Sequence, residues 1–243
     1  MLILGIDTAT ASVSLAIGDE TAILATLESH VGKRHAESVT PGIAAVCEAA
    51  GVTLRGLTAI TVGIGPGLFT GLRVGVATAK ALAFALGVPL IGVTSCDLIA
   101  GRLLAAPGFA PRPVVVIDAR RSEVFVAPYR LGETDSLGEA ALDPLAEPSV
   151  ERPEALAERL RAATEVVQLV GDGALRYRHL FEDHVILDET WAAPSAAVAV
   201  CFARTKVAGA LPAGADAVQP LYLRRPDAEA NWTERGRVVG TQR

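Results

Sequence analysis

Residues 63–83 read GIGPGLFTGLRVGVATAKALA, and this stretch decides the fold. The apolar run at residues 59–64 leads into it and is typical of a buried strand. Glycines then crowd the junction, as they do at tight turns between a strand and a helix. We expect a long helix from about 71 to 86, capped at its start by Thr70 and ended by Gly87. A buried strand that turns sharply into a helix is typical of an α/β protein.

The residues before this stretch predict a small antiparallel meander followed by a helix. Apolar runs with partial alternation predict strands at residues 2–7, 11–18 and 21–29. A helix is expected over about 36–50, because apolar residues recur on one face and a glycine follows. The Pro41-Gly42 pair suits a first turn better than a helix interior, so we expect regular helix to begin only near residue 40.

The residues after this stretch predict a second set of similar elements. Strands are expected at residues 90–93, 114–118, 123–130 and 166–170, and helices at 95–105, 153–163 and 194–208. The restart at residue 114, with a strand, a charged turn and another strand, looks like a distant duplicate of residues 2–18. We therefore predict two subdomains, residues 1–106 and 107–210, and a C-terminal segment, 211–243, whose tail from about 225 is loose.

Composition and charge exclude several classes of protein. Hydrophobic residues make up 51% of the 243, enough for a sizeable core. Lys and Arg number 22 against 27 Asp and Glu, and the net charge of −5 disfavours a protein that binds nucleic acid alone. The uncharged run between Lys80 and Asp97 is shorter than the roughly 20 residues that span a membrane. Three widely spaced cysteines indicate reduced thiols, and we expect a cytoplasmic protein.

Two features of the first half could carry chemistry. Asp7-Thr8 follows a buried strand, where it could hold a hydrated metal ion and a phosphate, or could simply hydrogen-bond its own turn. The glycine-rich segment 63–73 could hold an anion at the start of a helix or could be a structural turn. It matches neither GxxxxGK[ST] nor a well-formed GxGxxG. The sequence also holds no HExxH pair and no G-x-S-x-G, which disfavours a peptidase.

Small residues recur every four positions on the helix expected at 71–86. Gly71, Gly75, Ala79 and Ala83 form a stripe without bulky side chains, along which another helix could approach closely. That neighbour is either part of the same chain or a helix of a partner.

Several segments together resemble one protein family. They are GIDTATASVSLAI (5–17), HAES…P (35–41), GIGPGLFTGLRVGVATAKALA (63–83), VPLIGVTS (88–95) and PLYLR (220–224). In this order they resemble the TsaB family, also called YeaZ, whose frequent Ser in GPG-x-FTGLR is Leu68 here. The resemblance is dense over residues 1–100 and sparse afterwards. It implies the α/β fold of the actin/Hsp70/sugar-kinase (ASKHA) superfamily, with two duplicated halves of β-meander plus helices.

The resemblance also implies a function. TsaB is a non-catalytic subunit that pairs with its paralogue TsaD, which transfers a threonylcarbamoyl group to adenosine 37 of tRNA. TsaD holds a metal with a His-x-x-x-His pair, and Ser95 and Ile99 stand at about those positions here. We therefore expect no catalytic residue, no metal and no cofactor. The expected partners are TsaD, the ATPase TsaE in the same assembly, a second copy of the chain when alone, and tRNA only within the complex.

The pairing surface implied by the family consists of the helices at 36–50 and 71–86. The candidate interface residues are His35, Val39, Leu68, Phe69, Gly71, Arg73, Gly75, Val76, Ala79 and Ala83. The alternative function is an ATP-binding phosphotransferase or ATPase of the same superfamily, for which Asp7 and Thr8 would be weak phosphate-site candidates.

Overall fold

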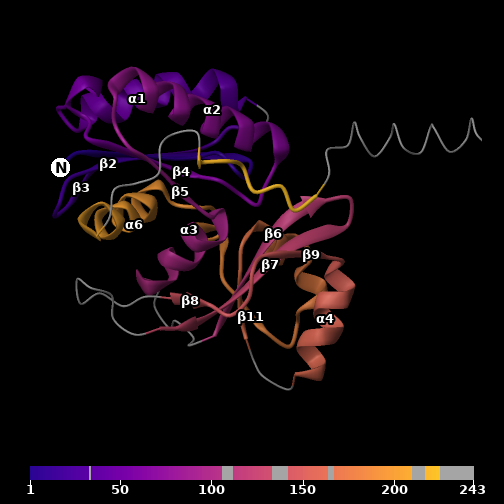
Figure 1. Ribbon diagram of the computed structural model, residues 1–243. Helices are drawn as coiled ribbons and strands as arrows, with labels where there is room; N and C mark the ends of the chain where they lie inside the picture. The colour runs from indigo at the N-terminus through magenta and orange to yellow at the C-terminus, as the bar shows by residue number, and fades with distance from the viewer. Residues whose placement is uncertain (33, 106–111, 133–141, 164–166, 210–216, 225–243) are drawn as a thin grey trace, which may run out of the picture.

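The computed structural model describes residues 1–32, 34–105, 112–132, 142–163, 167–209 and 217–224. Two β-sheets form the centres of two lobes, with helices on the outside of each sheet and more helices between them (Figure 1). The expected α/β class is confirmed.

The first sheet has the order β3-β2-β1-β4-β5. Its strands are β1 (Ile3–Asp7), β2 (Ser12–Gly18), β3 (Ile23–His30), β4 (Ala59–Gly63) and β5 (Leu90–Val93). The first three form the expected antiparallel meander, whereas β4 and β5 run parallel to β1. Every residue of β1 and β4 is buried, because helices cover both faces of the sheet.

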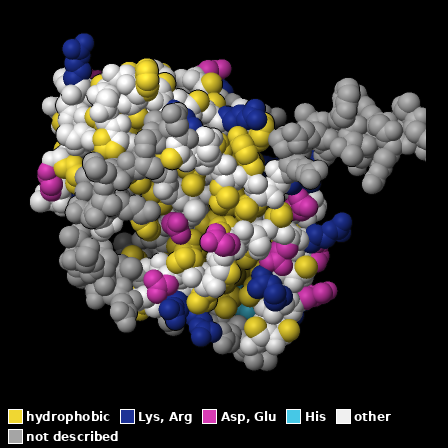
Figure 2. Space-filling model, in the orientation of Figure 1, with side chains coloured by type: hydrophobic (Ala, Val, Ile, Leu, Met, Phe, Trp, Pro, Cys, Tyr) yellow, Lys and Arg dark blue, Asp and Glu magenta, His cyan; other side chains and the backbone are white. Residues whose placement is uncertain are grey.

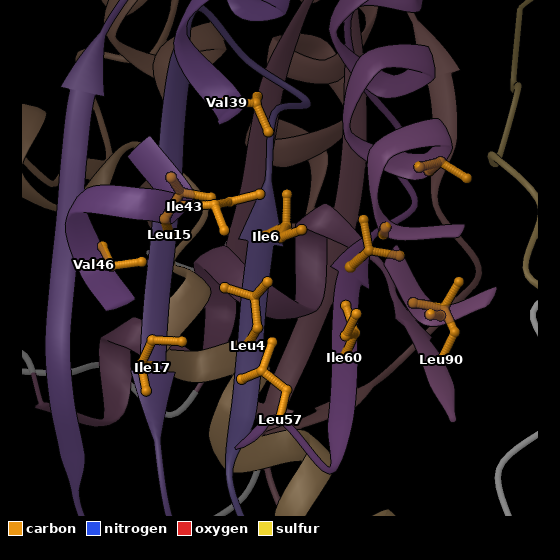
Figure 3. Close-up of a cluster of buried hydrophobic side chains, with 14 of the residues drawn as sticks. Leu4, Ile6, Leu15, Ile17, Val39, Ile43, Val46, Leu57, Ile60 and Leu90 are labelled. Carbon is orange, nitrogen blue, oxygen red and sulfur yellow. The ribbon is translucent and has the colours of Figure 1, made fainter. Parts of the chain in front are cut away.

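Two helices, α1 (His35–Ala49) and α2 (Phe69–Leu86), cover the outer face of this sheet. Figure 3 shows apolar side chains of α1 directed onto the strands beneath it. The cluster includes Val39, Ile43 and Val46 of α1, Leu4 and Ile6 of β1, Leu15 and Ile17 of β2, and Ile60 of β4. Burial of this apolar area is the main stabilising term of the first lobe.

Both helices begin earlier than expected. The prediction that α1 becomes regular only near residue 40 is wrong, because Pro41 lies inside it. Pro41 is exposed, so the helical bond that it cannot donate lies on the water side, where solvent can replace it. Thr70 is not the N-cap of α2 either: that position is Leu68, whose side chain makes no capping bond.

The second sheet repeats the pairing of the first. Its strands are β6 (Pro113–Arg120), β7 (Glu123–Leu131), β8 (Leu142–Pro144), β9 (Ser149–Glu151), β10 (Gln168–Val170) and β11 (Val185–Ile186). The order is β11-β10-β6-β7-β8, with β9 also paired to β7. Strand β6 is antiparallel to β7 and parallel to β10, as β1 is antiparallel to β2 and parallel to β4. This repeat supports the predicted duplication.

The remaining helices complete the two lobes. They are α3 (Ser95–Arg102), α4 (Pro153–Ala162), α5 (Asp172–Arg176) and α6 (Ala196–Gly209), with 3-10 turns at Leu54–Gly56, Leu103–Ala105, Arg178–Leu180 and Glu189–Trp191. Helix α5 and strand β11 are missing from the sequence-based expectation, because segments of five and two residues are too short to show a period.

A helix that follows each sheet packs against the core of the other lobe. Cys96 and Ile99 of α3, which follows the first sheet, pack with the second-sheet core around Ile117. Ala199 and Val200 of α6, which follows the second sheet, pack with the first-sheet core around Ile3. The division into 1–106 and 107–210 stays a prediction, but this packing cuts across it, and residues 106–111 and most of 211–243 lie outside the described part of the chain.

Within the described residues one helix, α2, is long and apolar enough to cross a membrane by length and composition alone. Its inner side is already covered, because Leu72 and Val76 are buried within the chain. Arg73 and Lys80 interrupt its apolar sequence. The core helix of a globular protein meets the same criterion, and the inner side of α2 belongs to the core of the first lobe.

Candidate functional site

Hydrogen bonds with neighbouring residues of the chain hold the turn that follows β1. Asp7 accepts one from the Ala9 amide at 2.9 Å and one from the Ser95 hydroxyl at 2.9 Å. Thr8 donates its hydroxyl to the Gly71 carbonyl at 2.7 Å. Both side chains are buried, so neither is directed to solvent.

The glycines of the deciding stretch fit against this turn. A Cβ at Gly63 would collide with the Asp7 carboxylate, and one at Gly75 would collide with the Thr8 hydroxyl. Gly67 and Gly71 lie equally close to backbone carbonyls of the same turn. The glycines therefore serve close packing of α2 on the end of β1, which is the structural alternative for this segment.

Burial also changes the acidity of this turn. Desolvation raises the pKa of Asp7 to about 6, although the hydrogen bonds from Ala9 and Ser95 act in the opposite direction. Asp7 and Thr8 are 1% and 0% exposed, so neither is open to a phosphate from solvent. The geometry thus favours hydrogen bonding of the turn over a phosphate site at Asp7 and Thr8.

Ser95 and Ile99 stand at the positions implied for two metal-binding histidines. Both side chains make contacts within the chain. Ser95 is bonded to Asp7, and Ile99 is fully buried in the second-sheet core. Among the described residues, no three or more His, Cys, Asp or Glu side chains come together as a metal site.

The small-residue stripe of α2 faces the interior of the chain. Gly71, Gly75, Val76, Ala79 and Ala83 are all buried on the side toward the sheet. Their burial favours packing within the chain for these five candidates, and their place in an interface stays a prediction.

The two α1 candidates are buried as well. His35 is 3% exposed and its Nε2 lies 2.8 Å from the Thr10 carbonyl, whereas Val39 packs in the first core. His35 therefore helps to join α1 to the β1–β2 turn.

The outer face of the same two helices is the surface open to a partner. On α2 the exposed residues are Thr70, Arg73, Ala77, Ala81, Phe84 and Ala85, and on α1 they are Ala36, Glu37, Thr40, Pro41, Ala44, Ala45, Glu48 and Ala49. We call this set the outer α1–α2 face. Phe84 is 88% exposed, which is unusual for a large aromatic side chain. The face is rich in alanine. Its residues recur at helical spacing on the side of each helix opposite the buried stripe, so the sequence pattern could have predicted this face.

Three candidates at the start of α2 remain at least partly accessible, and two of them hold the C-terminal segment. The Arg73 guanidinium lies 3.8 Å from the centroid of the Phe69 ring, and its Nε donates to the Tyr222 hydroxyl at 3.1 Å. Leu68, the third, is half-buried and donates its amide to Ala9. Tyr222 was not among the predicted residues, because no local pattern links it to α2.

Comparisons with known proteins agree with the fold. A family model described as "TsaD: tRNA N6-adenosine threonylcarbamoyltransferase" matches residues 28–232. The "tRNA threonylcarbamoyladenosine biosynthesis protein TsaB" of Escherichia coli is 30% identical over 92% of this chain and 95% of that protein. A crystal structure of a Pseudomonas aeruginosa protein "with similarity to peptidase YEAZ" is 30% identical, with a TM-score of 0.77 over 92% of this chain and 99% of that one.

Other relatives are matched only in part. An "Uncharacterized protein" of Mycobacterium leprae is 43% identical over 54% of this chain and 36% of that protein. The chain covers 58% of the length of a Mycobacterium bovis relative. It therefore spans about a third to three fifths of these mycobacterial relatives.

Two sheets with matching strand order and exchanged helices define a two-lobed α/β protein with an ASKHA-like fold. Within that class, the near full-length matches are decisive. The chain belongs to the TsaB (YeaZ) family.

Proposed function

We propose that this chain is a non-catalytic, cytoplasmic subunit of the assembly that makes threonylcarbamoyladenosine in tRNA, and that it pairs with a TsaD-type catalytic subunit. The near full-length match to Escherichia coli TsaB carries the proposal. Positions 95 and 99 hold buried Ser and Ile side chains, neither of which is an imidazole ligand. This favours an accessory role over a catalytic one.

The outer α1–α2 face is the proposed pairing surface. Exposed alanines let a partner helix approach closely, and Phe84 offers a single large apolar anchor at one end. The same face would form the homodimer when the chain is alone. A TsaE-type ATPase and tRNA would join only the paired assembly.

A capture experiment with the TsaD-type protein of the same organism tests the surface. Ala81→Arg and Phe84→Ser change exposed residues, so both variants should fold, and each should weaken capture at least tenfold. Ala155→Arg is the matched control, because Ala155 is an exposed alanine on α4, away from this face. Undiminished capture by both variants would reject the outer α1–α2 face as the pairing surface.

The supporting role has its own test. Purified TsaD-type protein with threonylcarbamoyl-AMP and tRNA should form the modified nucleoside faster when this chain is added. The chain without TsaD should form none. Product formed by this chain alone would contradict a non-catalytic role.

A further inference from the structure

Residues 220–224 read PLYLR and are part of the family resemblance, yet they lie outside the outer α1–α2 face. They belong to residues 217–224, which we call the C-terminal strap. Figure 1 shows the strap, in yellow, running from the first lobe toward the β6–β7 hairpin of the second. Residues 221–224 also line a cleft between the two lobes. The strap therefore lies against both lobes.

Hydrogen bonds to the backbone of each lobe fix the strap on both sides of Tyr222. The Leu221 amide donates to the Ile64 carbonyl of the first lobe at 2.7 Å. The Arg224 guanidinium donates to the Ala119 carbonyl of the second lobe at 2.8 Å. These bonds hold the backbone around Tyr222, so the place of its side chain is set by the packing of both lobes.

The Tyr222 side chain holds an arginine at the beginning of α2. Its hydroxyl accepts a hydrogen bond from Arg73 Nε at 3.1 Å, and its ring centroid lies 5.1 Å from that of Phe69. The Arg73 guanidinium in turn lies 3.8 Å from the Phe69 centroid. Both contacts restrict the rotation of the long arginine side chain, so the guanidinium has a set orientation.

This arrangement leaves part of the arginine able to bind another group. Arg73 is exposed and lies on the outer α1–α2 face, and within the described residues only its Nε makes a hydrogen bond. The two terminal nitrogens can donate a pair of parallel hydrogen bonds to one carboxylate. A side chain that is ordered beforehand loses less entropy when it binds.

We propose that Tyr222 is a positioning residue for pairing, which sets the orientation in which Arg73 binds a carboxylate of the TsaD-type subunit. The inference rests on the proposed function and names one contact within the outer α1–α2 face. Figure 2 shows basic and acidic side chains interspersed on the visible face. A single oriented arginine, and not a broad basic patch, therefore selects the carboxylate of the partner.

Capture of the TsaD-type protein measures the effect of Tyr222. Tyr222→Phe removes only the hydroxyl and keeps the ring on Phe69, so the variant should fold. It should weaken capture at least about threefold, because Arg73 loses the bond that orients it. Tyr177→Phe is the matched control, because Tyr177 lies beside Arg176 on the second lobe, and its capture should be unchanged. Equal melting temperatures verify the fold of both. Wild-type capture by Tyr222→Phe would overturn the proposal.

A double-variant cycle separates positioning from a merely structural role. Arg73→Ala removes the carboxylate contact and should weaken capture at least about tenfold. Tyr222→Phe should cause no further loss in the Arg73→Ala background, because its effect passes through Arg73. Losses that multiply would refute the positioning role. Added salt should weaken capture by the wild type more than capture by Arg73→Ala, and an equal salt dependence would contradict a carboxylate as the bound group.

The variants of the outer α1–α2 face distinguish a failure of this inference from a failure of the proposed function. If Ala81→Arg and Phe84→Ser weaken capture but Tyr222→Phe does not, the pairing surface stands and the positioning role fails. If none of the three variants weakens capture, both fail.

Discussion

At the scale of single residues, Asp7 and Asp172 are carboxyl groups whose ionisation is opposed by their surroundings. Asp7 is buried at the end of β1 and Asp172 is the partly buried first residue of α5, and desolvation raises the pKa of each to about 6. A carboxyl with a raised pKa binds more protons in the folded chain than in the unfolded chain between about pH 4 and 6. The free energy of unfolding therefore falls as the pH rises through this window.

Asp7→Asn tests this pH dependence of the free energy of unfolding, at a residue that also joins β1 to α3. The variant removes a change of about 2 kcal/mol between pH 4 and pH 7, because about two pKa units separate the folded and unfolded carboxyl and the unfolded one is already partly ionised at pH 4. Urea unfolding at several pH values measures it. The variant should lose less stability on going from pH 4 to pH 7 than the wild type, with the remaining slope due partly to Asp172. Identical slopes would show that Asp7 does not titrate in this range.

At the scale of elements, the position of α2 on the sheet is set by the turn that lies beneath it. Its glycines touch a turn that is far away in sequence: Thr8 and Gly71 are 63 positions apart and share a hydrogen bond. The helix can lie this low on the sheet only because Gly71 and Gly75 have no side chain.

Gly75→Ala should therefore destabilise the fold although alanine favours helix. The added methyl would collide with the Thr8 hydroxyl, and overpacking of this kind costs about 2 kcal/mol. Gly56→Ala is the control, because a Cβ there meets no atom closer than 3.7 Å. Thermal unfolding compares the two. A Gly75→Ala protein as stable as Gly56→Ala would mean that α2 can shift outward freely.

The elements of the first lobe are largely predictable from sequence, and the orientation of α2 is not. Strands β1, β4 and β5 and helix α2 carry clear apolar runs or periods, so their positions follow from local patterns. Ala79 and Ala81 are equally small, however, and only the packed sheet shows that Ala79 is buried and Ala81 exposed. The cleft between the two lobes also escapes prediction, because its lining residues come from segments far apart in the sequence.

At the scale of the whole molecule, we expect the exchanged helices to make the two lobes one cooperative unit. The first sheet is covered on one face by α1 and α2 and on the other by α6, which belongs to the far end of the described chain. A Cβ at Gly5 or Gly18 would touch α6, so the contact is close.

Val200→Asp tests whether the two lobes unfold cooperatively. Val200 is fully buried against the first sheet, and a charge there costs several kcal/mol. Amide hydrogen exchange should show lost protection in β1 and β2, although these strands lie nearly 200 residues away in the chain. Ala155→Asp, on the exposed face of α4, should leave those amides protected. Full protection of β1 and β2 in Val200→Asp would show that the first lobe stands without α6.

The late position of α6 has a consequence for synthesis. When a ribosome has released residues 1–106, all five strands of the first sheet are outside, yet the face that α6 will cover is still bare. Apolar side chains such as Ile3 and Ile91 stay exposed until almost the whole chain has been translated. The nascent chain is thus vulnerable to aggregation for most of its translation, and a chaperone that covers this face would raise the yield of folded protein.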